Sequence, residues 1–249
     1  MLSSKNIVLE AKGISKYFGT ITALENVNLT VRQGECLGVV GDNGAGKSTF
    51  MKVLSGLYKP SSGSLFFDGN KETLNSPKDS QNLGLEMVYQ DLALAGNLPI
   101  GENIFLGREP TKKFGFLKLL DYKKIKELSE AHLDKLKIHV KSAEQKVEEL
   151  SGGQRQAIAI ARATAFNSKI VIMDEPTAAL AIKEVGKVLD LINSLKKMGV
   201  SVIIISHRMD DIFAVCDRVM ALFQGTNFAE SELSKTTRDE VIGWIMGKK

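Results

Sequence analysis

A glycine-rich segment, Gly41-Asp42-Asn43-Gly44-Ala45-Gly46-Lys47-Ser48, constrains the fold of this chain more than any other stretch. It matches the pattern G-x-x-x-x-G-K-[ST] in full and lies between an apolar run at 36–40 and a helical pattern at 48–57. In such a strand–loop–helix unit the glycines let the backbone wrap around phosphate oxygens, and the helix N-terminus adds positive potential. The segment, extended by Thr49, predicts a nucleotide-phosphate site in which Lys47 reaches the β- and γ-phosphates and Ser48 ligates Mg²⁺.

The hydrophobic periodicity of the rest of the chain predicts an α/β fold with a mainly parallel sheet. Apolar runs at 170–173 and 202–205 indicate buried strands, separated by a helix that carries Ile182, Val185, Leu189 and Ile192 on one stripe. Strand patterns at 7–14, 27–31 and 63–68 predict a small β layer, and 92–166 reads as mostly helical. A strand at 219–223 and a helix at 237–246 come last. We find no repeat or linker, so we expect one domain with a helical insertion.

Composition and charge narrow the class of protein. The chain has 249 residues, 43% of them hydrophobic and 25% charged, which is typical of a globular protein. Its net charge of +4 comes from scattered basic residues rather than a basic stripe, so we expect no nucleic-acid partner. Cys36 and Cys216, the only cysteines, predict neither a disulfide framework nor a zinc site. With no secretory leader pattern and no run long enough to span a membrane, we expect a soluble protein or one held peripherally on a membrane by a partner.

A second motif, Leu150-Ser151-Gly152-Gly153-Gln154, predicts the start of a helix that runs to about residue 166. Ser151-x-x-Gln154 has the form of a capping box, with Ser151 as the N-cap and Gln154 reaching back to it. A purely structural cap would need neither Gly152 nor Gly153, whereas close approach of a ligand benefits from both. The motif therefore predicts a helix end that exposes its first amides to an anion such as phosphate.

Together these motifs resemble those of the ATP-binding cassette ATPases. The second motif resembles that family's signature, and it is followed by Asp174-Glu175-Pro176-Thr177 after a buried strand; Gln90 and His207 lie in the family's order. The resemblance covers essentially the whole chain and implies a single nucleotide-binding domain over 1–249. Its core would be a P-loop α/β fold with an N-terminal antiparallel β layer and a helical subdomain at roughly 91–166. It also implies that two copies sandwich two ATP molecules, each signature segment facing the γ-phosphate bound by the other copy.

The resemblance assigns roles to single residues. Asp174 ends a buried strand, where a carboxylate needs a partner, and corresponds to the family's Mg²⁺ ligand. Glu175 resembles the general base that polarises the attacking water, although an Asp-Glu pair could also cap a helix. Gln90 resembles the glutamine that contacts Mg²⁺ or water, and His207 the histidine that contacts the γ-phosphate. With Lys47, the residues Glu175, His207 and Gln90 form the expected catalytic set, and Ser48, Gln90 and Asp174 the metal set.

Two further positions bear on the nucleotide. The family stacks adenine on an aromatic residue before a glycine in the first hairpin, where this chain has Phe18-Gly19, with Tyr17 as the neighbouring alternative. An ordinary hairpin aromatic is a third interpretation. After Thr177 the family usually carries an aspartate that contacts the other copy, and here Ala181 replaces it. This replacement puts the coupling between the two sites in question.

Features outside the motifs favour an importer subunit at the cytoplasmic face of the inner membrane. The chain lacks the fused span of a single-chain exporter, the coiled coil of the repair proteins and the second cassette of the translation factors. The stretch from Leu98 to Glu109 and the ending Thr237…Gly247 resemble the monosaccharide uptake ATPases, in their single-cassette form. Partners would be a second copy, a permease and, indirectly, an extracytoplasmic solute-binding protein. A branched-chain amino-acid importer is the alternative, and a soluble ATPase outside transport is a weaker one.

Overall fold

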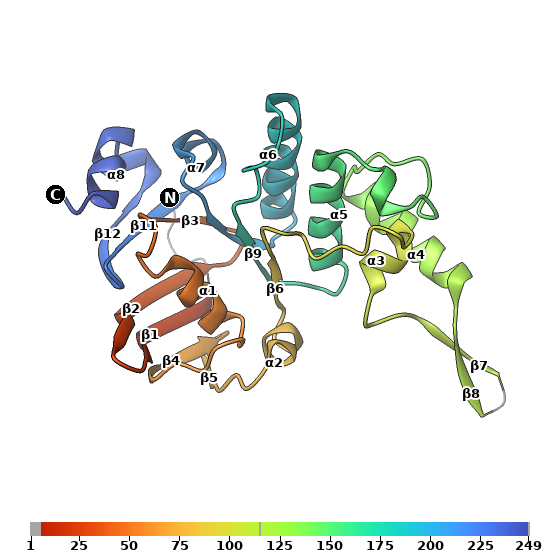
Figure 1. Cartoon of the computed structure of the whole chain (residues 1–249), viewed down its shortest axis with the longest axis horizontal. Coiled ribbons are helices and arrows are strands. Elements are labelled where there is room, and N and C mark those ends of the chain that lie inside the picture. The colour runs from red at the N-terminus through yellow and green to blue at the C-terminus, as the bar shows by residue number, and fades with distance from the viewer. Residues whose placement is uncertain (1–5, 115, 249) are drawn as a thin grey trace.

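A computed structural model describes residues 6–114 and 116–248 of the protein. Its centre is a six-stranded sheet in the order β12-β11-β3-β10-β9-β6, in which β11, β3, β10, β9 and β6 run parallel (Figure 1). Its strands are β3 (Cys36–Val40), β6 (Leu85–Val88), β9 (Ile170–Asp174), β10 (Ser201–Ile205), β11 (Arg218–Phe223) and β12 (Thr226–Glu232). The mainly parallel sheet expected from the sequence is confirmed, and the antiparallel edge strand β12 is an element that the sequence did not predict.

The expected N-terminal β layer is also present. It is an antiparallel sheet in the order β2-β1-β4-β5, made of β1 (Ile7–Phe18), β2 (Ile21–Arg32), β4 (Ser62–Phe67) and the short β5 (Asn70–Glu72). One face of this layer is buried through Leu9, Ile14, Leu29 and Val31, as alternation in a half-buried sheet requires. The layer lies beside α1 (Lys47–Leu54), the helix opened by the phosphate loop, which is our name for residues 41–48 (Figure 1).

The parallel strands are buried on both faces, and their residues divide between two hydrophobic cores. Along β10, Ile203 and Ile205 pack with the antiparallel layer and α1, whereas Val202 and Ile204 face the helices on the other side. This alternation follows from the period of two in a strand. The helix side is covered by α5 (Gly152–Thr164), α6 (Ile182–Lys197), α7 (Met209–Val215) and α8 (Arg238–Ile245). The sheet is therefore a rigid platform between two apolar layers.

The region expected to be mostly helical contains α3 (Ile100–Phe105), α4 (Tyr122–Lys135), the short 3₁₀ helix η1 (Val147–Glu149) and α5. The prediction was incomplete, because a β-hairpin of β7 (Thr111–Phe114) and β8 (Leu117–Leu120) interrupts these helices and extends away from them (Figure 1). His132 of α4 packs on α5, where its Nε2 lies 3.0 Å from the Ala161 carbonyl and 3.1 Å from Thr164 Oγ1. His132 is therefore a packing residue between α4 and α5.

Some smaller observations complete the fold. In α6 the buried stripe begins at Val185, and Ile182 is 90% exposed because it is the first residue of the helix; its expected place in the packed face was wrong. A short helix α2 (Pro77–Asn82) precedes β6, and a 3₁₀ turn η2 (Leu233–Lys235) precedes α8. Cys36 and Cys216 are free thiols with their Sγ atoms 3.5 Å apart. None of the helices described here is long and apolar enough to cross a membrane.

Candidate nucleotide site

Four loops that carry predicted site residues meet at one edge of the parallel sheet. The phosphate loop follows β3, and His207 follows β10. Asp174 ends β9 and Glu175 follows it, and Gln90 follows β6. The strands are neighbours in the order β3-β10-β9-β6, and their register places Val39 opposite Ile205 and Ile205 opposite Asp174. Because the carboxyl ends of neighbouring parallel strands are level, residues far apart in the sequence share this edge.

The phosphate loop is held by backbone contacts that require glycine at two positions. Gly41 has φ 154°, and a Cβ there would lie 2.4 Å from the Leu222 carbonyl oxygen. Gly46 has φ 98°, and its Cβ would lie 2.8 Å from the Ala23 carbonyl oxygen. The N–H of Gly225 also donates to the Ala45 carbonyl at 3.1 Å. The loop is therefore fixed between β2 and the β11–β12 turn, while Asp42, Asn43, Gly44 and Ser48 are exposed.

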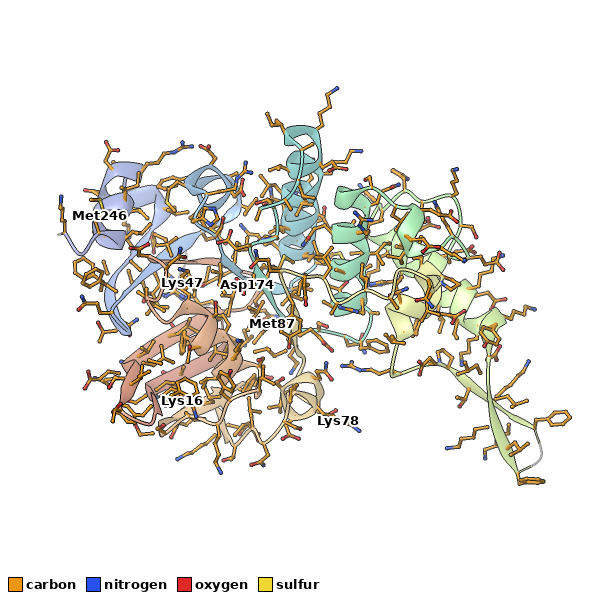
Figure 2. The ribbon with its side chains drawn as sticks, viewed as in Figure 1. Lys16, Lys47, Lys78, Met87, Asp174 and Met246 are labelled. Atoms are coloured by element: carbon orange, nitrogen blue, oxygen red, sulfur yellow. The ribbon has the colours of Figure 1, made fainter. Side chains whose placement is uncertain are left out.

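Lys47 closes the phosphate loop on itself. Its ammonium donates to the carbonyls of Gly41 at 2.7 Å and Asp42 at 2.9 Å. Burial lowers the pKa of Lys47, and the charges of Glu175 and Asp174 oppose that change. Figure 2 shows Lys47 and Asp174 near each other at the centre of the molecule. The Lys47 ammonium therefore lies over the phosphate loop, close enough for its charge to interact with the carboxylates of Asp174 and Glu175.

Asp174 and Glu175 occupy different surroundings. Burial raises the pKa of the half-buried Asp174 carboxyl, Glu175 adds to the rise, and Lys47 opposes it. One oxygen of Glu175, Oε1, lies 2.7 Å from Nδ1 of the exposed His207. The other oxygen, Oε2, is buried and has no hydrogen-bond partner among residues 6–114 and 116–248. An unpaired buried carboxylate oxygen is costly, so it marks a place where a water or another donor would bind.

A buried aspartate supports the loops that carry this pair. Asp211, in the first turn of α7, accepts a hydrogen bond from the Thr177 hydroxyl and lies 3.3 Å from Nε of Arg208. Thr177 follows Glu175 by two residues and Arg208 follows His207 directly. Asp211 therefore ties the two loops together, a positioning role that the sequence motifs did not indicate.

Gln90 is exposed and begins the segment that leads into the helical region. The two guanidinium nitrogens of Arg162 on α5 donate to the carbonyls of Leu92 and Ala93, at 2.7 and 2.6 Å. Leu92 and Ala93 both have left-handed backbone angles, with φ 61° and 46°. Arg162 thus holds the strained segment after Gln90 on α5. This contact joins the sheet edge to the helical region.

Two aromatic residues, Phe18 and Tyr17, are candidates for stacking on adenine. Phe18 packs edge-to-face on Tyr58 with ring centroids 5.4 Å apart, and the Lys16 ammonium lies 5.0 Å from the Phe18 ring centroid. Phe18 is 41% exposed and Tyr17 45% exposed. Both rings can therefore be reached from outside, and the assignment of Phe18 stays a prediction.

The signature segment, residues 150–154, starts α5 as predicted. The Gln154 N–H donates to Ser151 Oγ at 3.3 Å and the Ser151 N–H donates to Gln154 Oε1 at 3.1 Å, which completes the capping box. Among the described residues, no hydrogen bond or ion pair joins this segment to the phosphate loop. The structure thus groups the phosphate loop, Asp174, Glu175, His207 and Gln90 at the sheet edge, and residues 151–154 are not part of this group; their anion binding stays a prediction.

The carboxylate of Glu184, on α6, contacts this helix end. Ser151 Oγ donates to Glu184 Oε1 at 2.8 Å, and this bond, with the Gly153 backbone, lowers the pKa of Glu184. A Cβ on Gly153 would lie 2.8 Å from the Cβ of Glu184, so glycine allows the approach. A cavity of about 370 Å³ opens beside this contact. Glu184 was not predicted; the only sequence signal is its place three residues after Ala181, where a capping box would put a glutamate.

The fold and the sheet-edge site define a P-loop nucleotide-binding protein. A family model described as "ABC transporter" matches residues 24–178, more than half of the chain. A xylose/arabinose import ATP-binding protein of Sulfolobus acidocaldarius is 46% identical over 94% of this chain and 92% of its own length. The chain belongs to the ABC transporter family, as an ATP-binding cassette ATPase.

Other relatives agree at the level of the family. A ribose import ATP-binding protein of Bacillus subtilis is 39% identical over 97% of this chain, and the match covers 48% of that relative, so the chain spans about half its length. A crystal structure of a nucleotide-free ATP-binding cassette from an ABC transporter has TM-score 0.81 and 27% identity, over 96% of this chain and 95% of that one. A dimeric post-hydrolysis cassette bound to ADP and Pi has TM-score 0.74 and 28% identity, over 90% and 98%.

Proposed function

We propose that this chain is the ATP-hydrolysing subunit of an importer for a monosaccharide, acting through a separate permease. The observation that carries the catalytic part is the Glu175–His207 contact at the sheet edge, beside a buried carboxylate oxygen that lacks a partner. The import of a sugar is supported by the relatives, whose names describe xylose/arabinose, ribose and galactose import.

In this proposal one set of residues binds the phosphates of ATP and another binds Mg²⁺. The backbone amides of the phosphate loop and the Lys47 ammonium bind the phosphates of ATP, and Thr49 extends the loop into α1. Ser48, Gln90 and Asp174 would hold Mg²⁺, which supplies positive charge against the phosphate oxygens. One carboxylate, one hydroxyl and one amide oxygen are the hard oxygen ligands that Mg²⁺ prefers, and phosphate oxygens would complete its coordination.

Glu175 is the proposed general base. Its free oxygen Oε2 accepts a hydrogen bond from the attacking water and takes its proton as the water oxygen bonds to the γ-phosphorus; the bond from the γ-phosphorus to the β,γ-bridging oxygen breaks, and ADP and phosphate leave. His207 holds the other oxygen and fixes the direction of the carboxylate. In this position the exposed His207 ring also reaches the γ-phosphate, as the family resemblance implies.

The second half of the site comes from another copy of the chain. Ser151, Gly152, Gly153 and Gln154 form a helix end suited to phosphate, yet they lie apart from the chain's own phosphate loop. A head-to-tail pair of copies would bring each helix end to the other copy's ATP. The existence of a dimeric cassette among the similar structures supports this arrangement.

The experiment that tests this function is ATPase stimulation in a reconstituted permease. The purified chain would be combined with candidate permeases in vesicles and supplied with solute-binding proteins loaded with pentoses, hexoses or branched-chain amino acids. We expect severalfold stimulation by a sugar-loaded protein and none when Glu175→Gln replaces the wild type. Stimulation only by amino-acid-loaded proteins would change the proposed solute from a sugar to an amino acid and would leave the proposed ATPase activity in place. Recovery of the chain with ribosomes rather than membranes would overturn the importer, and with it the placement at the cytoplasmic face of the inner membrane.

A further inference from the structure

The hairpin of β7 and β8 stands apart from the body of the protein. It extends from the helical region at one end of the longest axis, and its side chains point into open space (Figures 1 and 2). All eight strand residues are exposed, and Phe114 and Phe116 reach 73% and 97% exposure. A two-stranded hairpin with no layer packed on it is marginally stable in water. The hairpin therefore calls for a partner that covers it.

The register divides the hairpin into two chemically different faces. Residues directly opposite each other in an antiparallel pair share a face. Phe114 lies opposite Leu117 and Lys112 opposite Leu119, and the period of two puts these pairs on one face. Lys113 lies opposite Lys118 on the other face. One side of the hairpin is therefore mainly apolar, and the other presents a pair of ammonium groups.

The charges of the hairpin are not neutralised within the described protein. Lys112, Lys113 and Lys118 take part in none of the ion pairs formed by residues 6–114 and 116–248. Like charges directly opposite each other on a strand pair are destabilising. An anionic surface would remove this repulsion while an apolar layer covers Phe114 and Leu117. The partner must therefore be both anionic and apolar.

We propose that the β7–β8 hairpin docks on an anionic lipid surface, with its aromatic tip in the headgroup region and its lysines on the lipid phosphates. Phe116 and Phe114 supply the rings that insert, and the long lysine stems let their ammonium groups reach the phosphates from beside the apolar face. Insertion stays shallow, since the outer edges of both strands keep backbone groups that need water.

The shape of the hairpin favours lipid over a protein groove. A projecting tip enters a fluid layer without needing a preformed cavity, and mixed lysine and aromatic residues on one segment are typical of interfacial anchors. The inference rests on the proposed import function only in that a permease places the cassette beside a membrane. Vesicle binding itself requires neither permease, sugar nor ATP, so its failure is distinguishable from a failure of the import function.

The test is co-sedimentation of the full chain with vesicles of phosphatidylcholine, with and without phosphatidylglycerol. We expect binding only to the anionic vesicles, weakened by salt. Lys113→Gln with Lys118→Gln should reduce the affinity about 25-fold, because each lysine near an anionic surface contributes about fivefold. Phe114→Ser with Phe116→Ser should reduce it about tenfold or more. The matched controls, Lys78→Gln with Lys197→Gln and Ile21→Ser, change exposed residues of other elements and should keep the wild-type affinity.

A second measurement reports on depth directly. In a Phe116→Trp variant, anionic vesicles should shift the added tryptophan emission to shorter wavelength, while the Trp244 background stays constant. No binding to anionic vesicles, equal loss in the control variants, or an unshifted emission on bound vesicles would overturn the proposal. Hairpin variants that bind vesicles normally but lose stimulation by the permease would also overturn it, and would assign the surface to the permease protein.

Discussion

Glu175 sits in a backbone conformation that glutamate rarely adopts. Its φ is 50°, in the left-handed region, and its N–H donates to the Ile205 carbonyl at 2.9 Å. Such a conformation costs on the order of 1 kcal/mol and persists where the surroundings over-determine it. Here the turn directs the carboxylate toward His207 and leaves Oε2 unpaired. The strained position is consistent with a residue selected for chemistry rather than for packing.

Replacing Glu175 by Gln tests that role at the residue scale. The amide keeps the size of the side chain but cannot take a proton, so we expect turnover to fall about a hundredfold or more while nucleotide binding is retained. Steady-state ATPase assays and nucleotide titrations measure the two effects separately. Glu127→Gln, which alters an exposed carboxylate on α4, is the control and should hydrolyse at the parental rate. Parental turnover in Glu175→Gln would remove the residue from its proposed role.

The burial of His132 predicts a pH-dependent stability. Burial lowers its pKa in the folded state, so between the folded and unfolded pKa values the unfolded chain binds more protons. The free energy of unfolding should therefore fall as the pH drops through about 6.5, the ordinary value for histidine. Urea unfolding at pH 5.5 and 8 should show a smaller pH effect in His132→Gln than in the wild type. The exposed His139→Gln is the control, and an equal reduction there would contradict the assignment.

Among single residues, the sequence predicted those that belong to a motif of consecutive positions. The phosphate loop, the Ser151 cap and the Asp174-Glu175 pair could be found because each motif occupies consecutive residues. Asp211 and Glu184 could not, because their partners Thr177 and Ser151 lie 34 and 33 residues away and come together only when α6 and α7 pack. The choice between Phe18 and Tyr17 also depends on where adenine lies, which no pattern in the first hairpin specifies.

Helix α6 begins without a side-chain cap. Ala181 is its N-cap residue, with the extended backbone angles φ −66° and ψ 152° that suit a capping side chain, yet its methyl group accepts no hydrogen bond. The Glu184 carboxylate accepts hydrogen bonds from the Ala181 backbone and from Ser151 Oγ, so it supplies the glutamate half of a capping box. The first turn of α6 therefore lacks the half of the box that a side chain at position 181 would supply.

Two substitutions at Ala181 separate stability from communication between sites. Ala181→Asp and Ala181→Ser should each raise the free energy of unfolding by about 1 kcal/mol, because both side chains can cap α6. If the family's aspartate couples the two sites, ATP hydrolysis should become more cooperative in Ala181→Asp alone. Denaturation curves and the ATP dependence of the rate measure these effects. Unchanged stability in both variants would show that the helix start gains nothing from a cap.

The elements differ in how far sequence could predict them. Strands β3, β9 and β10 were found because burial on both faces requires continuous apolar runs, which few other structures contain. Strand β12 was missed because it lies at the sheet edge and its polar sequence has no clear alternation. The β7–β8 hairpin was missed for a related reason: nothing covers it, so no buried face imposes a period on its residues.

At the scale of the whole molecule, the proposed function places the phosphate loop and the signature segment of one chain in two different sites. Glu175→Gln should therefore form dimers only in the presence of ATP, because ATP that is bound but not hydrolysed holds two copies together. Light scattering with and without ATP measures this directly, and Ser151→Arg in the same background should stay monomeric since its side chain blocks the helix end. A monomer at saturating ATP in Glu175→Gln would contradict the two-copy site.

Because the proposed function assigns Lys47 and Ser151 of one chain to different sites, two inactive variants should complement each other. A Lys47→Ala chain and a Ser151→Arg chain are each inactive as homodimers, since every site in either pair carries a defect. In a mixed dimer both defects fall on one site and the other is whole. Equal mixing should make about half of the dimers mixed and leave about a quarter of the sites intact. Activity recovered near that fraction would mean independent sites, and a lower recovery would measure how strongly one site depends on the other.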